Sequence, residues 1–147
     1  IQVVGYGHLV TGCTSSKNGF CPAGSLVYGI HTGSGGLIKD NVSRNNGTGA
    51  STSVLAIIAG YGSTITGNTV YNNGDSSTGS YVYGIVTDGA SSVVGNTVYS
   101  NGNSATGTVY GIYPGGNCLL DQNTAYSNGG TNMYISAANT YGINHAP

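Results

Sequence analysis

The residues that could perform acid–base chemistry in this chain are few and widely separated. Its acids are four aspartates, Asp40, Asp75, Asp88 and Asp121. Glycoside hydrolysis uses a pair of carboxyl groups, and calcium is held by several acidic oxygens together. The four aspartates occupy four different positions of an internal repeat, so we do not expect a paired-carboxylate site. We predict no catalytic residue, no metal site and no cofactor.

One loose cluster of charges remains, formed by Lys39, Asp40 and Arg44. A solvated group of surface charges is the simpler interpretation of this cluster. The histidines are scattered in the same way, at His8, His31 and His145. His8 and His31 could approach each other across adjacent coils, but an ordinary surface or corner histidine is more common than a base or a ligand.

The three cysteines offer one covalent possibility. Cys13 and Cys21 are close enough in sequence to form a disulfide within one loop, while Cys118 has no obvious partner. The alternative is that all three are reduced thiols that pack as small apolar residues.

These residues are positioned by an internal repeat. The segment TITGNTVYNNG at 64–74 returns as SVVGNTVYSNG at 92–102 and LLDQNTAYSNG at 119–129, with a weaker copy, LIKDNVSRNNG, at 37–47. Its asparagine recurs at intervals of 27, 28 and 27 residues, as Asn41, Asn68, Asn96 and Asn123. A fixed period of this size is typical of a solenoid.

The repeat predicts short strands joined by glycine-rich corners. Each copy is preceded by an apolar segment such as VYGI at 27–30 or 82–85, and β-branched residues and tyrosine dominate the apolar positions. We expect an all-β, right-handed parallel β-helix of about five to six coils in a single domain, 1–147. Within it, 1–25 is an atypical first coil, 26–130 holds the regular coils and 131–147 is a shortened last coil.

Stacking of equivalent coils predicts the core. One expected column is Val10, Ile38, Ile65, Val93 and Leu120. A second is Ile30, Ile57, Ile85 and Ile112, with Tyr28, Leu55, Tyr83 and Tyr110 two residues earlier on the same face. In the last coil, MYI at 133–135 and YGI at 141–143 both resemble the strand opening.

Two columns of asparagine are interpreted as structural ladders. The first is the repeat asparagine itself, and its stacked amides can bond to the coils above and below. The second column precedes a glycine each time and suits the left-handed backbone region that asparagine tolerates. Its members are Asn18, Asn46, Asn73, Asn101 and Asn128.

The outward positions of the repeat form the candidate binding surface. Threonine and tyrosine recur there at the same two positions: Thr69, Tyr71, Thr97, Tyr99, Thr124 and Tyr126. Tyrosine rings at coil spacing could hold sugar faces or pack against another protein. The alternative is that tyrosine simply suits a strand and shields the sheet. Ice binding is disfavoured, because it requires threonine where tyrosine stands.

The amino-acid composition limits the classes of binding partner that we expect. Charged residues make up 5% of the chain and the net charge is -1, so we expect neither nucleic-acid binding nor attraction to an anionic membrane. No run approaches the roughly 20 apolar residues of a membrane span. The first residue is Ile1, so we expect a processed piece of a longer precursor.

The pattern GI, a glycine-rich bend and I-x-G-N-T-V-Y-x-N-G resembles the repeat of right-handed parallel β-helix proteins of the pectin-lyase-like superfamily. The run CLLDQNTAYSNGG and the terminal GINHAP are similar to the end of secreted bacterial β-helix proteins. The resemblance implies export to the cell surface or the medium. An enzyme of this superfamily would be a polysaccharide lyase or a glycoside hydrolase.

We therefore expect an extracellular structural or adhesive module that self-associates head-to-tail into a fibre or surface assembly through its terminal coils. The alternative is a protein that binds polysaccharide on the tyrosine column or cleaves it weakly.

Overall fold

The chain folds into a parallel β-helix with three sheets. The structure, a computed structural model, describes residues 1–19 and 25–147. Sheet A contains β1 (Gln2–Val3), β4 (Val27–Thr32), β7 (Val54–Ala59), β10 (Tyr81–Thr87), β13 (Thr108–Tyr113) and β16 (Thr131–Met133). Sheet B contains β2 (Leu9–Thr11), β5 (Leu37–Lys39), β8 (Thr64–Thr66), β11 (Ser92–Val94), β14 (Leu119–Asp121) and β17 (Thr140–Tyr141). Sheet C contains β3 (Thr14–Ser16), β6 (Val42–Arg44), β9 (Thr69–Tyr71), β12 (Thr97–Tyr99) and β15 (Thr124–Tyr126).

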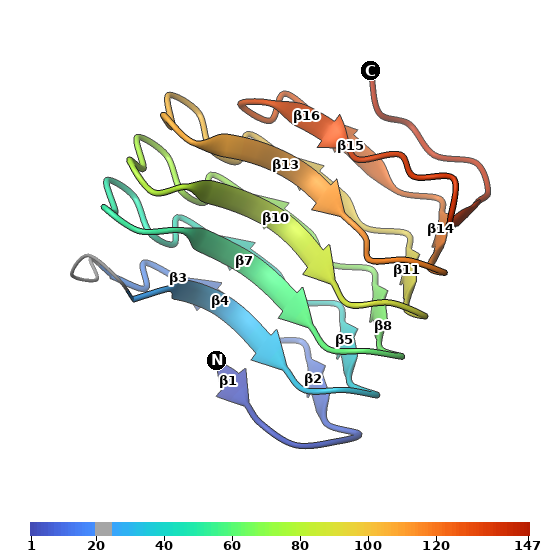
Figure 1. The fold of residues 1–147 in the computed structure, drawn as a ribbon. Coiled ribbons are helices and arrows are strands. Elements are labelled where there is room, and N and C mark those ends of the chain that lie inside the picture. Colours follow the sequence, from blue (N-terminus) through green and yellow to red (C-terminus); the bar gives the residue numbers. More distant parts are fainter. Residues whose placement is uncertain (20–24) are drawn as a thin grey trace.

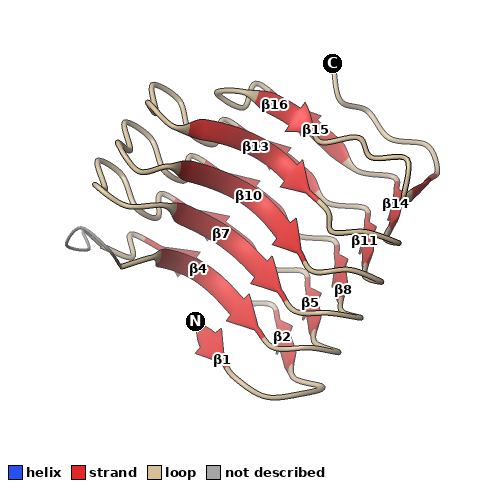
Figure 2. Ribbon diagram, viewed as in Figure 1, coloured by secondary structure: helices blue, strands red, loops and turns tan. Residues whose placement is uncertain are grey.

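Each turn of the helix adds one strand to each sheet. Figure 1 shows the right-handed winding: the chain runs along sheet A at the front, turns into sheet B at the right and returns behind through sheet C. The described residues form five three-stranded coils and a partial sixth from β16 and β17. Only strands and loops are present in this part of the chain (Figure 2). The predicted all-β solenoid with a repeat of about 27 residues is confirmed.

Sheet B follows the predicted alternation. Ile38 pairs in register with Val10 on one side and with Ile65 on the other, and Val93 and Leu120 continue the column. All five side chains are buried in one core cluster. A strand of three residues offers one inward position, so period-two alternation is sufficient to predict it.

Sheet A departs from strict alternation, and the predicted tyrosine column in the core is wrong. In β10, Val82 and Ile85 are both buried, whereas Tyr83 and Val86 lie on the outer face and are only partly buried. The register pairs Tyr83 with Tyr110 and Ile85 with Ile112 but skips the glycine between them. The strand bends at this glycine, so Tyr83 before it points outward and Ile85 after it points into the core.

The bend divides the interior into two apolar clusters. The larger contains the isoleucine column of sheet A together with the inward residues of sheets B and C. The smaller contains Val27, Val54, Val82 and Val109 with Ala50. Leu55 is the exception in its column, because it is buried while its tyrosine neighbours are not.

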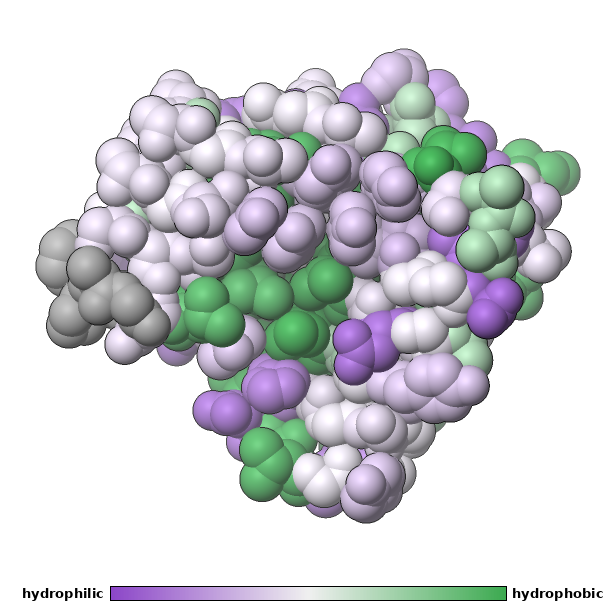
Figure 3. All heavy atoms as spheres, viewed as in Figure 1, coloured by the Kyte–Doolittle hydropathy of each residue, from purple (hydrophilic) through white to green (hydrophobic). Residues whose placement is uncertain are grey.

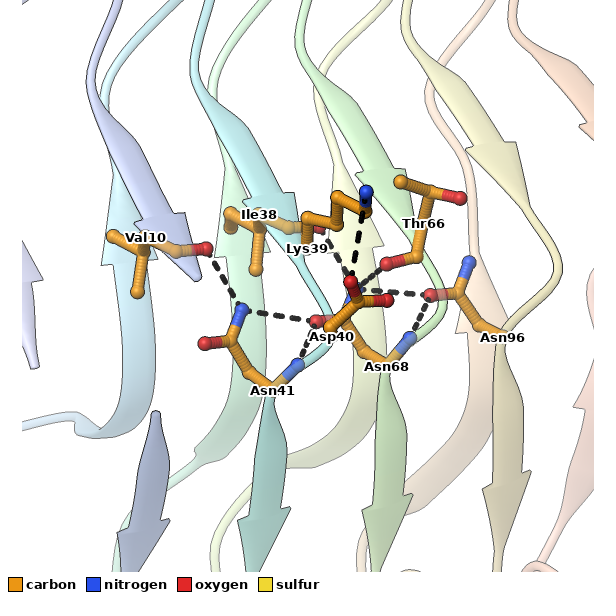
Figure 4. Close-up of polar contacts among 8 residues, drawn as sticks. All are labelled: Val10, Ile38, Lys39, Asp40, Asn41, Thr66, Asn68 and Asn96. Carbon is orange, nitrogen blue, oxygen red and sulfur yellow. Dashed lines mark hydrogen bonds and ion pairs between the residues drawn. The ribbon is translucent and has the colours of Figure 1, made fainter. Parts of the chain in front are cut away.

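The asparagine ladders lie at the two ends of sheet C. In the first, between sheets B and C, each amide Nδ2 donates to the Oδ1 of the next asparagine at 3.0 Å (Figure 4). The same Nδ2 also donates to a backbone carbonyl of the preceding coil, as Asn68 does to Ile38 at 2.9 Å. In the second, the amide bonds are 2.8–2.9 Å from Asn18 to Asn128. Both predicted ladders are present.

The left-handed backbone region is not occupied by the second ladder, and that prediction is wrong. The residues with positive φ precede the ladder asparagines: Lys17, Asn45, Asn72, Ser100 and Ser127. The glycine after several of the ladder asparagines, such as Gly74 with φ 67°, also lies in this region. The ladder side chain has to point inward to bond with its neighbours, so the sharp change of direction falls on the residues that flank it.

The last coil resolves the two alternatives at the C-terminal end. Met133 pairs with Ile112 in sheet A, and Tyr141 pairs with Leu120 in sheet B. Two asparagines outside the regular period complete the ladders. Asn144 accepts from Asn123 at 3.0 Å, and Asn132 accepts from Asn128 at 3.1 Å.

The corner between sheets A and B offers a test of backbone strain. Ala90 is exposed and has φ 55°, while its equivalent in the preceding coil is Gly62 with φ 67°. Ala90→Gly removes a left-handed alanine, and we expect a gain of about 0.5 kcal/mol after the larger chain entropy of the unfolded glycine is subtracted. Urea unfolding measures it. The reciprocal Gly62→Ala should destabilise by a similar amount, and equal stability of the two variants would contradict this interpretation.

Candidate functional site

The acidic residues do not form a site. Asp40 forms an exposed ion pair with Lys39, with Nζ and Oδ2 3.6 Å apart. The Oδ1 of Asp121 accepts a hydrogen bond from the backbone N–H of Ile143 at 2.8 Å, which holds the terminal segment. Among the described residues, no three side chains of histidine, cysteine or acid are gathered as a metal site would require.

The histidines have separate surroundings. The Nε2 of His8 lies 2.7 Å from the carbonyl oxygen of Val4, and the ring of His31 lies against Tyr28 with centroids 4.9 Å apart. His145 pairs with Thr124 at the end of sheet C. Nothing in these contacts joins a histidine to an acid.

The predicted disulfide falls on Cys21, which lies outside the described residues, so the pairing with Cys13 stays a prediction. Cys118 is buried, and its Sγ lies 3.6 Å from the hydroxyl of Thr87. It packs as a small core residue at the corner between sheets A and B.

Two open hollows of about 260 and 270 Å³ lie in the first two coils, and a third of about 360 Å³ lies at the last coil. The largest is lined by Gln122, Asn123, Thr124, Ile143, Asn144 and His145. An acid lines none of these three.

The outer face of sheet C brings together the predicted threonine and tyrosine residues. Thr69, Thr97 and Thr124 pair in register, and so do Tyr71, Tyr99 and Tyr126. The tyrosine rings form a stack: the centroids of Tyr71 and Tyr99 are 5.0 Å apart with planes inclined by 1°, and those of Tyr99 and Tyr126 are 5.2 Å apart and inclined by 6°. We call this the sheet C stack.

The geometry of the sheet C stack limits what it can bind. Parallel rings at this spacing cover one another's faces, so ring edges and hydroxyls are what they present to solvent. A sugar that packs on an aromatic ring needs an open face. The stack therefore offers a row of hydroxyls beside a row of threonines rather than aromatic platforms.

A second group of tyrosines lies on the outer face of sheet A, and it was not foreseen from the sequence. It consists of Tyr81, Tyr83, Tyr110, Tyr113 and Tyr134, which we call the sheet A cluster. Tyr113 is its centre, with ring centroids 4.9 Å from Tyr110, 4.8 Å from Tyr134 and 5.4 Å from Tyr83. The recurring tyrosine–glycine–isoleucine sequence was the signal, because a bend at the glycine turns the tyrosine outward.

In the sheet A cluster, Tyr83 lies nearly parallel to Tyr81 and Tyr110, at 8° and 15°, but other rings are inclined to one another. The planes of Tyr83 and Tyr113 meet at 40°, those of Tyr110 and Tyr113 at 55°, and those of Tyr110 and Tyr134 at 82°. Inclined rings leave parts of their faces uncovered. This is the main difference from the sheet C stack.

Aliphatic side chains continue the face of sheet A across its middle strands. Ile58 pairs with Val86, and Val86 pairs with Tyr113, on the outer side of the sheet. Figure 3, which views this face, shows a contiguous hydrophobic area with weakly hydrophilic residues above it and more strongly hydrophilic residues along its lower border. The six strands of sheet A contain no charged residue. Across its middle and last strands the face is thus mainly aliphatic and aromatic, while His31 and Gln2 continue the same row toward the first strand.

One tyrosine in each group has a raised pKa. Burial, followed by repulsion from Tyr113, Tyr81 and Tyr110, raises the pKa of Tyr83. Burial, followed by the neighbouring Tyr71 and Tyr126, raises the pKa of Tyr99. In each group a phenolate would be created beside other phenols and partly out of water.

The raised pKa values predict a loss of stability in alkali. The ordinary pKa of the two phenols is 10.0, and the folded chain raises it. The unfolded chain therefore loses its phenolic protons first, so their contribution to stability is complete below pH 10 and is lost as the pH rises through the folded values. Tyrosinate absorbance should titrate later in the folded protein than in urea. Coincident curves would contradict this, and a Tyr83→Phe, Tyr99→Phe double variant should narrow the gap.

The described residues contain no helix of the length and hydrophobicity that crossing a bilayer requires. The sequence matches no protein-family model, and neither a curated protein nor a solved structure is significantly similar to it.

Proposed function

We propose that the chain is an extracellular adhesive module that binds extended polysaccharides along the outer face of sheet A. The observation that carries this proposal is the sheet A cluster, in which Tyr113 is surrounded by tyrosines at inclinations of 28–55°. Inclined and partly exposed rings supply both faces for the apolar side of a sugar and hydroxyls for its polar rim.

The direction of the bound chain follows from the solenoid. Equivalent residues of adjacent coils are about 4.8 Å apart along the axis. This spacing is close to the length of one sugar unit in an extended glycan. A polysaccharide that lies along the axis therefore meets a similar set of side chains at each successive unit.

The charge of the ligand follows from the face. The six strands of sheet A carry neither acids nor basic residues other than His31. An anionic polymer would find no cation to replace its lost hydration, and burial of a charge without a partner is costly. We propose neutral glycans as the ligand class.

The test is titration of the protein with soluble neutral and uronic-acid polysaccharides by isothermal calorimetry or affinity electrophoresis. A Tyr110→Ala, Tyr113→Ala variant is expected to weaken binding of the neutral polymer at least about tenfold, or about 1.4 kcal/mol. The matched control is Tyr71→Ala, Tyr99→Ala on the sheet C stack. Equal losses of affinity in the two variants would show that the sheet A cluster is not the specific binding site. Failure of the unmodified protein to bind any glycan would contradict the proposal.

Head-to-tail self-association is the second candidate. The observation in its favour is that β1, β2 and β3 are the outermost described strands of the three sheets on the same side, and strand edges can pair with a further coil. At the other end, the backbone N–H of Ala125 donates to the carbonyl of His145, and Asn144 completes the first ladder. These bonds occupy positions that a second copy would need, which places assembly behind glycan binding.

Light scattering at increasing protein concentration separates the two candidates. Growth of the mass with concentration supports stacking of copies. A constant monomer mass at high concentration excludes it and leaves the glycan proposal untouched.

A further inference from the structure

The sheet A cluster also has the geometry of an oxidative cross-linking site. Coupling of two tyrosines joins the ring carbons next to their hydroxyls, and the two rings of the product are twisted against each other and meet edge to edge. A pair that already lies close, inclined and accessible needs the smallest movement to reach that product.

Tyr83 and Tyr113 satisfy these conditions. Their centroids are 5.4 Å apart, their planes are inclined by 40° and both side chains are only partly buried. Their backbones are offset, because Tyr83 pairs with Tyr110 and Val86 pairs with Tyr113. This diagonal placement keeps the two Cβ atoms further apart than those of directly paired residues. The rings can therefore approach by their edges.

The sheet C stack provides the contrast. Its rings belong to directly paired residues and lie parallel, at 1° and 6°. Equivalent carbons of such rings lie above one another, and an edge-to-edge bond would require the stack to open and the strands to separate. The ring centroids are similarly close in both groups, so the two groups differ in the inclination of the ring planes and in the offset of the backbones.

We propose that Tyr83 and Tyr113 form an intramolecular dityrosine bond when the protein meets a peroxidase and hydrogen peroxide. Each phenol loses one electron and one proton, the two radicals join carbon to carbon, and the hydrogen on each coupled carbon moves to the oxygen of its ring. Hydrogen peroxide takes up the two electrons and two protons and becomes two molecules of water. Contacts of Tyr83 with Tyr81 and Tyr110 allow a radical formed on a neighbour to reach the pair.

The bond would join β10 to β13, which belong to adjacent coils. A cross-link of this kind reduces the conformational freedom of the unfolded chain, as a disulfide does. The sheet A cluster would thereby supply a covalent connection between coils that resists unwinding.

The experiment treats dilute protein with a peroxidase and limited hydrogen peroxide, followed by dityrosine fluorescence and intact mass. Cleavage before aspartate separates the tyrosines into fragments 1–39, 40–74, 75–87, 88–120 and 121–147. The expected product is a monomer lighter by two hydrogens, in which 75–87 is joined to 88–120. Its thermal midpoint should rise relative to the untreated protein.

Three conservative variants assign the bond. Tyr113→Phe keeps the ring and should abolish the joined fragments and the rise in thermal midpoint. Tyr110→Phe and the stack control Tyr99→Phe should retain both. The proposal is overturned if the joined fragments persist in Tyr113→Phe, if the main product joins 40–74 to 88–120, if only covalent dimers form, or if no dityrosine is produced.

Discussion

Replacement of Asn96 with aspartate is expected to lower the free energy of unfolding by about 4 kcal/mol, one of the two largest effects that we predict for a single substitution in this chain. The Oδ1 of Asn96 accepts from the backbone N–H and the side-chain amide of Asn68, both at 3.0 Å. Its Nδ2 donates to the carbonyl of Ile65 at 2.9 Å and to the Oδ1 of Asn123 at 3.0 Å. The residue is almost completely buried, with 1% of its surface exposed.

Aspartate keeps the shape and the acceptor but loses the donor. Its second carboxylate oxygen would face the oxygens of Ile65 and Asn123 without a proton between them. The buried carboxyl group should therefore have a raised pKa in the folded variant. The protonated carboxyl group is then tolerated below the pKa of aspartate in the unfolded chain, which is near 4, and stability is lost as the pH rises and the group ionises. The loss of unfolding free energy relative to the unmodified protein should therefore grow between pH 4 and pH 7.

Urea unfolding at pH 4 and pH 7 measures both effects. Thr97→Ala, one residue further along and on the outer face, is the control and should cost less than about 0.5 kcal/mol. Asn144→Asp at the partly exposed end of the same ladder should cost about 1 kcal/mol and keeps the comparison possible if Asn96→Asp does not fold. A deficit at Asn96 that is small and independent of pH would show that the ladder is not the source of stability that its geometry indicates.

The ladders were predictable because the period of the sequence imposes them. The intervals of 27, 28 and 27 residues between Asn41, Asn68, Asn96 and Asn123 place identical amides one coil apart, and stacked amides satisfy one another. The ends were not predictable. Asn132 lies four residues after Asn128 and still receives its hydrogen bond, because the chain makes a short corner there and comes back over the ladder.

The inward and outward positions were predictable in sheets B and C, but in sheet A only the isoleucine column was predicted correctly. Three-residue strands such as β8 and β9 have the pattern outward, inward, outward, which alternation describes completely. The longer β10 and β13 contain a glycine at which the alternation restarts. A sequence shows that a glycine is present, but whether the strand bends there depends on how the adjacent coils pack.

The candidate site shows the same limit. The column of Tyr71, Tyr99 and Tyr126 follows directly from the repeat. The orientation of its rings does not, because ring planes are set by side-chain torsions and by contact between neighbours. Both groups consist of tyrosines on the outer face of a sheet, and only the structure shows that the sheet C rings lie parallel whereas Tyr113 is inclined to its neighbours by 28–55°.

The second large effect that we predict is the loss of stability on truncation of Ile85, which lies just after the bend in sheet A. Ile85→Ala is expected to lower the free energy of unfolding by about 3 kcal/mol, because Ile85 is fully buried between Ile57 and Ile112 and truncation leaves a cavity in a thin core. Each coil of a solenoid is stabilised by its two neighbours, so a defect in the middle weakens both interfaces.

The controls are the two residues that flank the bend on the outer face. Under strict alternation, Tyr83 would share the core with Ile85, and its truncation would cost 3–5 kcal/mol as for a buried aromatic residue. With the bend, Tyr83→Ala should cost about 1 kcal/mol from lost ring contacts, and Val86→Ala should cost a similar amount. Urea unfolding of the three variants decides between the two arrangements. Comparable losses of unfolding free energy at positions 83 and 85 would support simple alternation and contradict the outward position of Tyr83. A threefold difference would place Tyr83 on the surface, where both glycan binding and oxidative coupling require it.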